Sequence, residues 1–282
     1  MDLALADKAV FVTGASGGIG RALAEALAAE GARLLLQGGG RFDELEAWVA
    51  AQPWAERARC VRADVREPEQ LAAAVEVGVT AFGRLDACVA NAGVWPKPAL
   101  RLDEASVERI RDAVSVNLLG SAWTARAFMG QLARVGPRAD GHGAALVLIG
   151  STAGRFGERG HAEYAMAKAG LHGLLATLKN EIVALDPYAR VNLVQPGWTV
   201  THLVREELEI PGAIAGVART MPLRQLARAA DIARAVLFLC SPAMARHVTG
   251  EVLTVAGGME GRVVWSADEI DEDAVRRRLA ED

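Results

Sequence analysis

The amino-acid sequence predicts an α/β protein that forms one doubly wound domain, a seven-stranded parallel sheet with helices on both faces. Short apolar runs alternate along the chain with longer segments of helical pattern, and this alternation is typical of parallel strands joined by crossover helices. Several of the runs are almost wholly apolar, as expected of strands covered on both sides. The runs fill roughly 255 residues, which suits one large domain. We therefore predict a single domain over residues 1–261.

The expected elements follow one another in strict strand–helix order. The strands are Ala9–Thr13, Arg33–Gln37, Arg59–Arg62, Asp86–Ala90, Ala144–Ile149, Val191–Val194 and Val252–Val255. The helices are Ile19–Glu30, Asp43–Ala51, Glu67–Phe82, Ala105–Val135, Ala162–Ala184 and Ala230–Leu239. Gly31 follows the first helix, where a left-handed residue commonly ends a helix.

The composition describes a globular protein of nearly balanced charge. Its 282 residues carry 31 basic and 35 acidic side chains, a formal charge of −4, which argues against nucleic acid or an anionic membrane as a partner. No apolar run approaches the roughly 20 residues of a membrane span, and Met1–Ala4 lacks the features of a signal peptide. Cys60, Cys88 and Cys240 stand in apolar stretches without a C-x-x-C pair, which favours buried free thiols. We expect a cytoplasmic protein with no metal site.

Two segments do not fit the strand–helix rhythm. Residues 202–226 lie between a strand and a helix and are too long for a simple connection, so we expect a lid over a site at the carboxyl ends of the strands. Residues 262–282 form a tail rich in charge, in which Ser266 and Glu269 have the spacing of a capping box. We predict a short helix in this tail, either as a solvated appendage or as part of a subunit interface.

A glycine-rich turn follows the first strand and opens the first helix. Its sequence, Thr13 to Gly20, reads TGASGGIG. Small residues let a backbone approach a pyrophosphate, and a helix N-terminus offers unpaired N–H groups. Such a turn can also need glycine for its geometry alone, but its place at the first strand–helix junction favours cofactor binding. The candidate binding residues here are Gly14, Ser16, Gly18, Ile19 and Gly20.

The end of the second strand bears on the choice between NAD and NADP. Folds that bind NAD usually carry an acid here to hold the ribose 2′-hydroxyl. In this sequence Gln37 runs into Gly38 and two further glycines, and Arg41 follows. The missing carboxylate removes repulsion of a 2′-phosphate, and Arg41 could pair with one. Gly38 and Arg41 therefore favour NADP over NAD, unless Arg41 is only a solvated residue at the start of a helix.

Tyr164 and Lys168 form the candidate catalytic pair. Hydride transfer to a carbonyl creates an alkoxide, which needs an acid near the oxygen. Residues at i and i+4 share one face of a helix, and an ammonium group beside a phenol favours the phenolate. We therefore expect Lys168 to lower the pKa of Tyr164. Taken alone, a Tyr-x-x-x-Lys pattern is more often a surface pair.

Several motifs in a fixed order carry a family resemblance. Thr13–Gly20, Asn91-Ala92-Gly93, Val116-Asn117-Leu118, Ser151, Tyr164 to Lys168, Arg190-Val191-Asn192, Pro196-Gly197 and the closing Gly257-Gly258 together resemble the short-chain dehydrogenase/reductase family over residues 6–260. The resemblance implies a Rossmann fold, an NAD(P) cofactor and a small-molecule carbonyl or alcohol substrate. It also implies a homotetramer or homodimer built through the helices over 105–135 and 162–184.

The resemblance also implies residue roles. Tyr164 would be the general acid/base, Lys168 its electrostatic partner and a ribose ligand, Ser151 a hydrogen-bonding partner of the substrate oxygen, and Asn117 the holder of a water in a proton relay. Further cofactor contacts are expected from Asp64, Val65, Asn91, Ala92, Gly93, Pro196, Gly197, Thr199 and Thr201.

The substrate pocket is less clearly marked. We nominate Trp95, Phe156, His161, Trp198 and the lid over residues 202–226. Two tryptophans would suit an apolar or ring-shaped substrate, although Arg155 and Arg159 in the same loop could instead recognise an anion, and all of these residues could simply be packed or solvated.

The leading prediction is an NAD(P)-dependent ketoreductase or alcohol dehydrogenase. The alternatives are a diol or sugar dehydrogenase working oxidatively and, less favoured, an inactive nucleotide-binding protein. The spacing of Tyr164 and Lys168 disfavours an enoyl reductase, because that branch resembles a tyrosine and lysine six residues apart.

Overall fold

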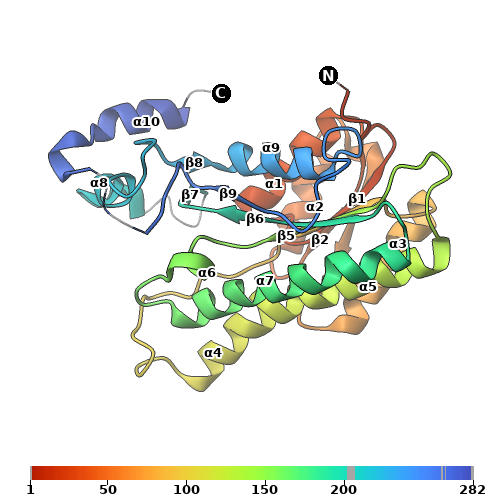
Figure 1. Cartoon of the computed structure of the whole chain (residues 1–282), viewed down its shortest axis with the longest axis horizontal. Helices are drawn as coiled ribbons and strands as arrows, with labels where there is room; N and C mark the ends of the chain where they lie inside the picture. The colour runs from red at the N-terminus through yellow and green to blue at the C-terminus, as the bar shows by residue number, and fades with distance from the viewer. Residues whose placement is uncertain (1, 202–206, 262, 264, 281–282) are drawn as a thin grey trace.

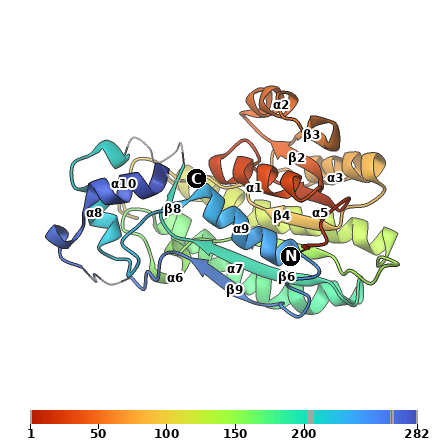
Figure 2. The ribbon, with the colours of Figure 1, turned by 90° about the horizontal axis from the view of Figure 1, so that it is seen from above.

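The centre of the molecule is a parallel sheet of seven strands in the order β3-β2-β1-β4-β5-β6-β9 (Figures 1 and 2). The computed structural model describes residues 2–201, 207–261, 263 and 265–280. The strands are β1 (Ala9–Val12), β2 (Arg33–Gly38), β3 (Ala58–Arg62), β4 (Ala87–Ala90), β5 (Ala145–Ile149), β6 (Arg190–Pro196) and β9 (Val252–Val255). Every pairing in this sheet is parallel. The predicted fold class is confirmed.

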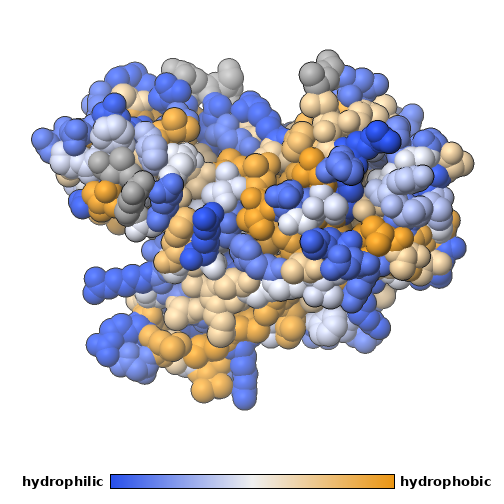
Figure 3. Space-filling view, viewed as in Figure 1, coloured by the Kyte–Doolittle hydropathy of each residue, from blue (hydrophilic) through white to orange (hydrophobic). Residues whose placement is uncertain are grey.

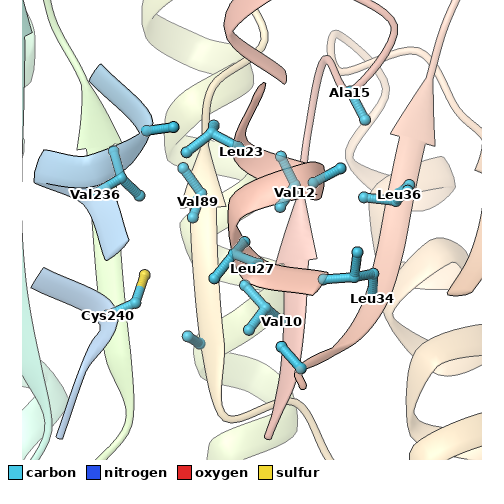
Figure 4. Close-up of a cluster of buried hydrophobic side chains, with 14 of the residues drawn as sticks. Val10, Val12, Ala15, Leu23, Leu27, Leu34, Leu36, Val89, Val236 and Cys240 are labelled. Carbon is cyan, nitrogen blue, oxygen red and sulfur yellow. The ribbon is translucent and has the colours of Figure 1, made fainter. Parts of the chain in front are cut away.

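Helices cover both faces of the sheet. They are α1 (Gly18–Ala29), α2 (Phe42–Ala50), α3 (Pro68–Phe82), α5 (Gly120–Val135), α7 (Ala162–Glu181) and α9 (Ala229–Cys240). Successive strand residues point to opposite faces, so Val10 and Val12 pack toward α1 and α9 (Figure 4). Phe11, between them, packs on the other face with residues of α3, α5 and α7. All three side chains are completely buried, which explains why the first strand reads as a continuous apolar run.

The strand order reverses between β1 and β4. The chain builds outward from β1 to β3 and then returns to place β4 on the other side of β1. At such a reversal the loops after the two neighbouring strands diverge and leave a crevice at the carboxyl edge of the sheet. The loops after β1 and β4 are those that carry the glycine-rich turn and Asn91.

The predicted helix over 105–135 is wrong as a single helix. The structure contains α4 (Val107–Val114), a π-helical turn (Ser115–Leu119) and α5. The Asn117 amide nitrogen donates to the Ala113 carbonyl at 3.0 Å, the carbonyl that the Asn117 backbone N–H would take in an α-helix. A side chain that competes for its own helix carbonyl disturbs the regular ladder, and π-turns are frequent at functional sites.

The segment after β6 and the tail form a small lobe beside the sheet, at the left of Figure 1. Residues 202–206 of the predicted lid lie outside the described residues, as do tail residues 262, 264, 281 and 282. The remainder contains β7 (Thr199–Val200), α8 (Ala213–Ala218), β8 (Ala227–Arg228), which pairs with β7, and α10 (Glu272–Ala280). The capping box of Ser266 and Glu269 is present, but it opens a 3₁₀ turn (Ala267–Glu269) before α10.

The lobe has an apolar core of its own. It combines Ile214 and Ala218 of α8 with Ile270 and Val275 of the tail. In the space-filling view a notch separates this lobe from the part of the molecule below it (Figure 3). Of the helices described, none has the length and apolarity needed to cross a membrane, and the described residues contain no group of three side chains suited to a metal ion.

Candidate active site

A cavity of about 620 Å³ lies at the carboxyl edge of the sheet. Its walls come from the segments that follow β1, β2, β3, β4, β5 and β6, together with the π-turn and α7. The predicted residues on its surface are Gly14, Ser16, Gly18, Ile19, Gly20, Arg41, Asp64, Val65, Asn91, Ala92, Gly93, Trp95, Asn117, Ser151, Tyr164, Lys168, Pro196, Gly197, Trp198, Thr199 and Thr201. Three of the nominated residues, Gly38, Phe156 and His161, are not part of this lining.

The glycine-rich turn leaves no room for side chains at its key positions. Gly14 has φ +64°, and a Cβ there would lie 2.7 Å from the Ala92 Cα; a Cβ on Gly20 would overlap the Gly14 carbonyl. Helix α1 begins at Gly18. Its N-cap residue is Gly17, and no side chain caps this end of the helix. The first turn of a helix has N–H groups without helical partners, so this cradle fits the pyrophosphate of a dinucleotide.

Hydrogen bonds fix the β4 turn against the glycine-rich turn. The Thr13 hydroxyl accepts from the backbone N–H groups of Asn91 at 3.1 Å and Ala92 at 3.2 Å. The Asn91 amide donates to the carbonyls of Thr13 at 2.9 Å and Gly14 at 3.2 Å. Asn91 therefore acts as a brace between two loops of the cavity.

Gln37 is a residue that the sequence analysis missed. Its side-chain oxygen accepts from the Gly14 N–H at 2.8 Å, and its amide donates to the Ala63 carbonyl at 2.5 Å. The side chain is buried, so these bonds satisfy it and tie the turns after β1 and β3 to the end of β2. The sequence signal for this role was a polar residue, Gln37, directly after the apolar run of the strand.

Charged groups line the cavity beside β2 and β3. Arg41, Asp64 and Arg66 are on its surface with Gly39 and Gly40. Arg66 forms ion pairs with Asp64 at 2.6 Å and Asp112 at 2.8 Å, and its hydrogen bonds lower the pKa of Asp64. Gly38 is instead packed below this surface, where a Cβ would lie 3.1 Å from a Leu45 methyl.

Ser151, Tyr164 and Lys168 meet in a part of the cavity separate from the charged groups beside β2 and β3. Tyr164 and Lys168 lie one turn apart on α7, and Ser151 follows β5. The Ser151 side chain is hydrogen-bonded to the Tyr164 phenol. The Lys168 ammonium lies 5.7 Å from the Tyr164 ring centroid and donates to the Ile149 carbonyl at 2.8 Å.

The pKa of Tyr164 is not lowered overall, contrary to the expectation drawn from the neighbouring Lys168. Burial raises the pKa of Tyr164 to about 12, and the charge of Glu158 adds to this effect, whereas the hydrogen bond with Ser151 opposes it. Burial also lowers the pKa of Lys168 to about 8. Loss of solvation disfavours the charged form of each group, and Lys168 is not among the groups that shift the pKa of Tyr164.

Asn117 shapes the wall of the cavity through Val94. Its side-chain oxygen accepts from the Val94 N–H at 3.1 Å, and its amide donates to the Val94 carbonyl at 3.0 Å. The side chain is fully buried. The π-turn thus holds the strand-like segment after β4, and with it the neighbouring Trp95.

Aromatic rings border the part of the cavity that holds Ser151, Tyr164 and Lys168. Trp95 stacks on His161 with centroids 3.8 Å apart and meets the Tyr164 ring edge-on at 4.8 Å. Trp198 lines the cavity and also packs against the core of the lobe. Arg155 and Arg159 are exposed and are not part of the lining. Phe156 packs beside Gly261 and under the Arg155 guanidinium.

The segment after β6 closes the cavity. The Thr152 N–H donates to the Pro196 carbonyl at 2.9 Å, and the Gly197 N–H donates to the Val255 carbonyl at 2.9 Å. The Thr199 hydroxyl donates to the Gly197 carbonyl at 3.0 Å. These bonds hold Pro196 to Thr199 against the loops that follow β5 and β9.

Comparison with known proteins gives consistent similarities. Residues 14–260 match a protein-family model described as enoyl-(acyl carrier protein) reductase. The chain is 32% identical over 257 residues to an L-rhamnose 1-dehydrogenase (NAD(P)(+)) from Sphingomonas sp. (strain SKA58), a match that covers 90% of this chain and 97% of that protein. It is 34% identical over 253 residues to the 3-oxoacyl-(acyl-carrier-protein) reductase FabG of Escherichia coli (strain K12), covering 89% and 97%. A crystal structure of a short-chain dehydrogenase/reductase from Brucella melitensis, of the glucose/ribitol dehydrogenase kind, matches with a TM-score of 0.82 and 31% identity, over 92% of this chain and 99% of that one.

Proposed function

Because this chain belongs to the short-chain dehydrogenase/reductase family and is an NAD(P)-dependent oxidoreductase, we propose that Tyr164 is its general acid/base in the interconversion of a carbonyl and a secondary alcohol. The observation that carries this proposal is the meeting of Ser151, Tyr164 and Lys168 at one end of a cavity whose other end is the glycine cradle. A nicotinamide cofactor, when bound, supplies or accepts the hydride.

Each side chain has a distinct role in the proposed reaction. In reduction the carbonyl oxygen accepts hydrogen bonds from Ser151 and Tyr164, and the phenol gives its proton to the developing alkoxide. In oxidation the same oxygen of Tyr164 takes the alcohol proton. Lys168 stabilises the phenolate electrostatically and is the residue placed to hold the ribose hydroxyls. Asn117 fits the role of fixing a water through which the proton reaches solvent.

We also propose that the cofactor is NADP rather than NAD. Two features favour it: Gln37 and Gly38 leave no carboxylate at the end of β2, and Arg41 lines the neighbouring cavity wall. A guanidinium there can pair with a 2′-phosphate. Fluorescence titration is expected to give tighter binding of NADPH than of NADH, and an Arg41→Ala substitution is expected to reduce that difference. Much tighter binding of NADH would contradict the preference.

The substrate that the cavity suits best is a ring-shaped secondary alcohol or its ketone. Trp95 and Trp198 offer apolar surface near the reacting end, which favours a ring. The sugar-dehydrogenase alternative fits as well, since one similar protein is an L-rhamnose 1-dehydrogenase. The four-residue spacing of Tyr164 and Lys168 favours this chemistry over the enoyl reduction in the description of the family model.

We further propose a cytoplasmic homodimer or homotetramer. The exposed apolar side chains of Val107 on α4 and Met166 on α7 lie on the helices that would form the interface. Light scattering at micromolar concentration is expected to give a multiple of the 29.7 kDa chain mass. A monomer mass would contradict the assembly.

A panel of cyclic ketones, cyclic alcohols and aldoses, with NADPH, NADH and their oxidised forms, tests the activity through absorbance at 340 nm. Tyr164→Phe is expected to lower kcat by a factor of about 10³ or more, the range for a lost acid that acts with its neighbours as a unit. NADPH binding, followed by its fluorescence, should stay within about twofold of the wild type. Retained turnover in Tyr164→Phe would contradict the assignment of the acid.

A further inference from the structure

One carboxylate on the cavity surface has no role in the proposed reaction. Glu158 lies in the loop between the short helix α6 (Ala153–Phe156) and α7, and it lines the cavity. It is partly buried, and burial raises the pKa of its carboxyl group. Within the part of the chain that the structure describes, no ion pair or side-chain hydrogen bond compensates this burial. A partly desolvated carboxylate without a compensating partner is costly to keep, which makes a ligand-binding role worth testing.

The Glu158 carboxylate acts on the reacting centre. It lines the same cavity as Tyr164, six positions before it in the chain, and its charge contributes to the raised pKa of that phenol. The charge works against phenolate formation, and Glu158 therefore does not help the proton transfer. A role for Glu158 must therefore lie in binding the substrate.

The cavity that Glu158 lines combines aromatic faces with hydrogen-bonding groups. Trp95 lies edge-on to Tyr164 at a centroid distance of 4.8 Å, and Ser151 and Trp198 line the same cavity. Aromatic rings suit the apolar face of a ring, while an ionised carboxylate accepts strong hydrogen bonds from hydroxyl groups. The same carboxylate repels a negatively charged substituent.

We propose that Glu158 determines substrate specificity by accepting a hydrogen bond from a second hydroxyl group next to the reacting carbon of a neutral polyhydroxylated ring, and by rejecting rings that carry a carboxylate there. This assignment rests on the proposed function, because it requires an alcohol or ketone bound at Tyr164. It narrows the substrate class from cyclic alcohols to cyclic diols and sugars.

Three ring compounds test the assignment: cyclohexanol, cis-1,2-cyclohexanediol and 2-hydroxycyclohexanecarboxylate. With the wild type, kcat/KM for the diol should exceed that for cyclohexanol by about tenfold or more, the effect of one hydrogen bond to a charged group. Glu158→Leu should bring this ratio close to one. Glu158→Gln should raise kcat/KM for the carboxylate, relative to that for cyclohexanol, by about tenfold, because it removes the repulsion while keeping the shape.

The ratios separate specificity from a general effect on catalysis. Removing the charge at residue 158 also favours the Tyr164 phenolate, but that change acts on all three rings alike and cancels in the ratio. Glu181→Gln, the same substitution at an exposed position at the end of α7 outside the cavity, should leave the ratios for the diol and the carboxylate to cyclohexanol unchanged. Equal changes for the three rings in both Glu158 variants would overturn the proposal.

Failure of the proposed function is recognised separately. Wild-type enzyme that binds NADPH and reduces other ketones in the 340 nm panel, but does not prefer the diol, would overturn the role of Glu158 and leave the oxidoreductase function standing. Wild-type enzyme that binds no nicotinamide nucleotide and turns over nothing in the panel would overturn both.

Discussion

Burial sets the ionisation of the two side chains at the centre of the site. It raises the pKa of Tyr164 to about 12 and lowers that of Lys168 to about 8. At pH 7 the free protein therefore holds a neutral phenol beside an ammonium. This is the pairing that carbonyl reduction needs, because the phenol must carry the proton that it will give away. The Lys168 ammonium then stabilises the phenolate only as it forms.

The pH dependence of reduction should report Lys168. The group is protonated below its folded pKa of about 8 and neutral above it, so kcat/KM for NADPH at saturating ketone should fall as the pH rises through about 8. This ratio reports ionisations of the free enzyme. Tyr164, with its pKa of about 12, stays protonated over this range. In Lys168→Arg the guanidinium does not titrate over this pH range. The fall in kcat/KM near pH 8 should therefore be absent, even if the activity of the variant is lower. The same fall in kcat/KM near pH 8 in the variant would mean that another group is responsible for it.

Residues in sequence motifs were easier to predict than residues defined by packing. Ser151, Tyr164 and Lys168 could be named from motifs that resemble those of the family, and all three line the cavity. Gln37 and Glu158 could not, because their importance depends on which loops the sheet order brings together. Phe156 was nominated for being near Ser151 in the chain, yet the four-residue helix α6 packs it beside Gly261, away from the lining.

At the level of elements, the tail helix α10 completes the lobe, whose core Trp198 connects to the cavity. Glu272 accepts a hydrogen bond from the Ala215 N–H of α8 at 2.9 Å, and the Trp265 indole donates to the Met221 carbonyl at 2.8 Å. Val275 is buried in the core of the lobe. Helix α8 has only six residues and would be marginal alone, so the tail supplies the surface against which it folds.

Disrupting the contact between α10 and α8 should weaken substrate binding selectively. A charge at position 275 cannot be buried in this apolar core without a large cost, so Val275→Asp is expected to detach the tail and raise KM for the ketone by about fivefold or more. The dissociation constant of NADPH should change less than about twofold, because the glycine cradle lies in another part of the molecule. Asp273→Asn, at an exposed position on the same helix, serves as the control. A parallel loss of NADPH affinity would mean that the tail supports the whole cavity instead.

Elements with strong periodicity were predicted well, and local irregularities were not. The seven strands could be located because buried parallel strands read as apolar runs. The π-turn in the middle helix could not, because the Asn117 side chain that bonds to the Ala113 carbonyl also bonds to Val94, a residue that only the tertiary fold brings near it. Pattern alone continues the helix through a π-turn, since one extra residue barely alters the apolar period.

Across the whole molecule, the two edges of the sheet serve different purposes. The carboxyl edge holds the cavity, whereas the amino edge is closed by charged side chains. Asp86, just before β4, accepts a hydrogen bond from the Ala9 N–H at 2.9 Å and pairs with Arg84 at 2.8 Å and Arg138 at 2.9 Å. The Asp86 side chain is only 6% exposed, so its partners satisfy a charge that solvent does not reach.

This division predicts that stability and activity can be lost independently. Asp86→Asn leaves two guanidinium groups without their shared carboxylate, and breaking such a buried pair costs about 3 kcal/mol, or roughly 6–10 °C in Tm for a chain of this size. Its kcat/KM at 20 °C should stay within about twofold of the wild type, because the cavity lies at the opposite edge. Ser151→Ala should do the reverse, lowering kcat by a factor of about 10² with Tm nearly unchanged. Differential scanning calorimetry measures Tm and steady-state kinetics measures kcat and kcat/KM of both variants, which tests both expectations. A fall in kcat/KM of Asp86→Asn that matches its fall in stability would show that the amino edge positions the catalytic groups as well.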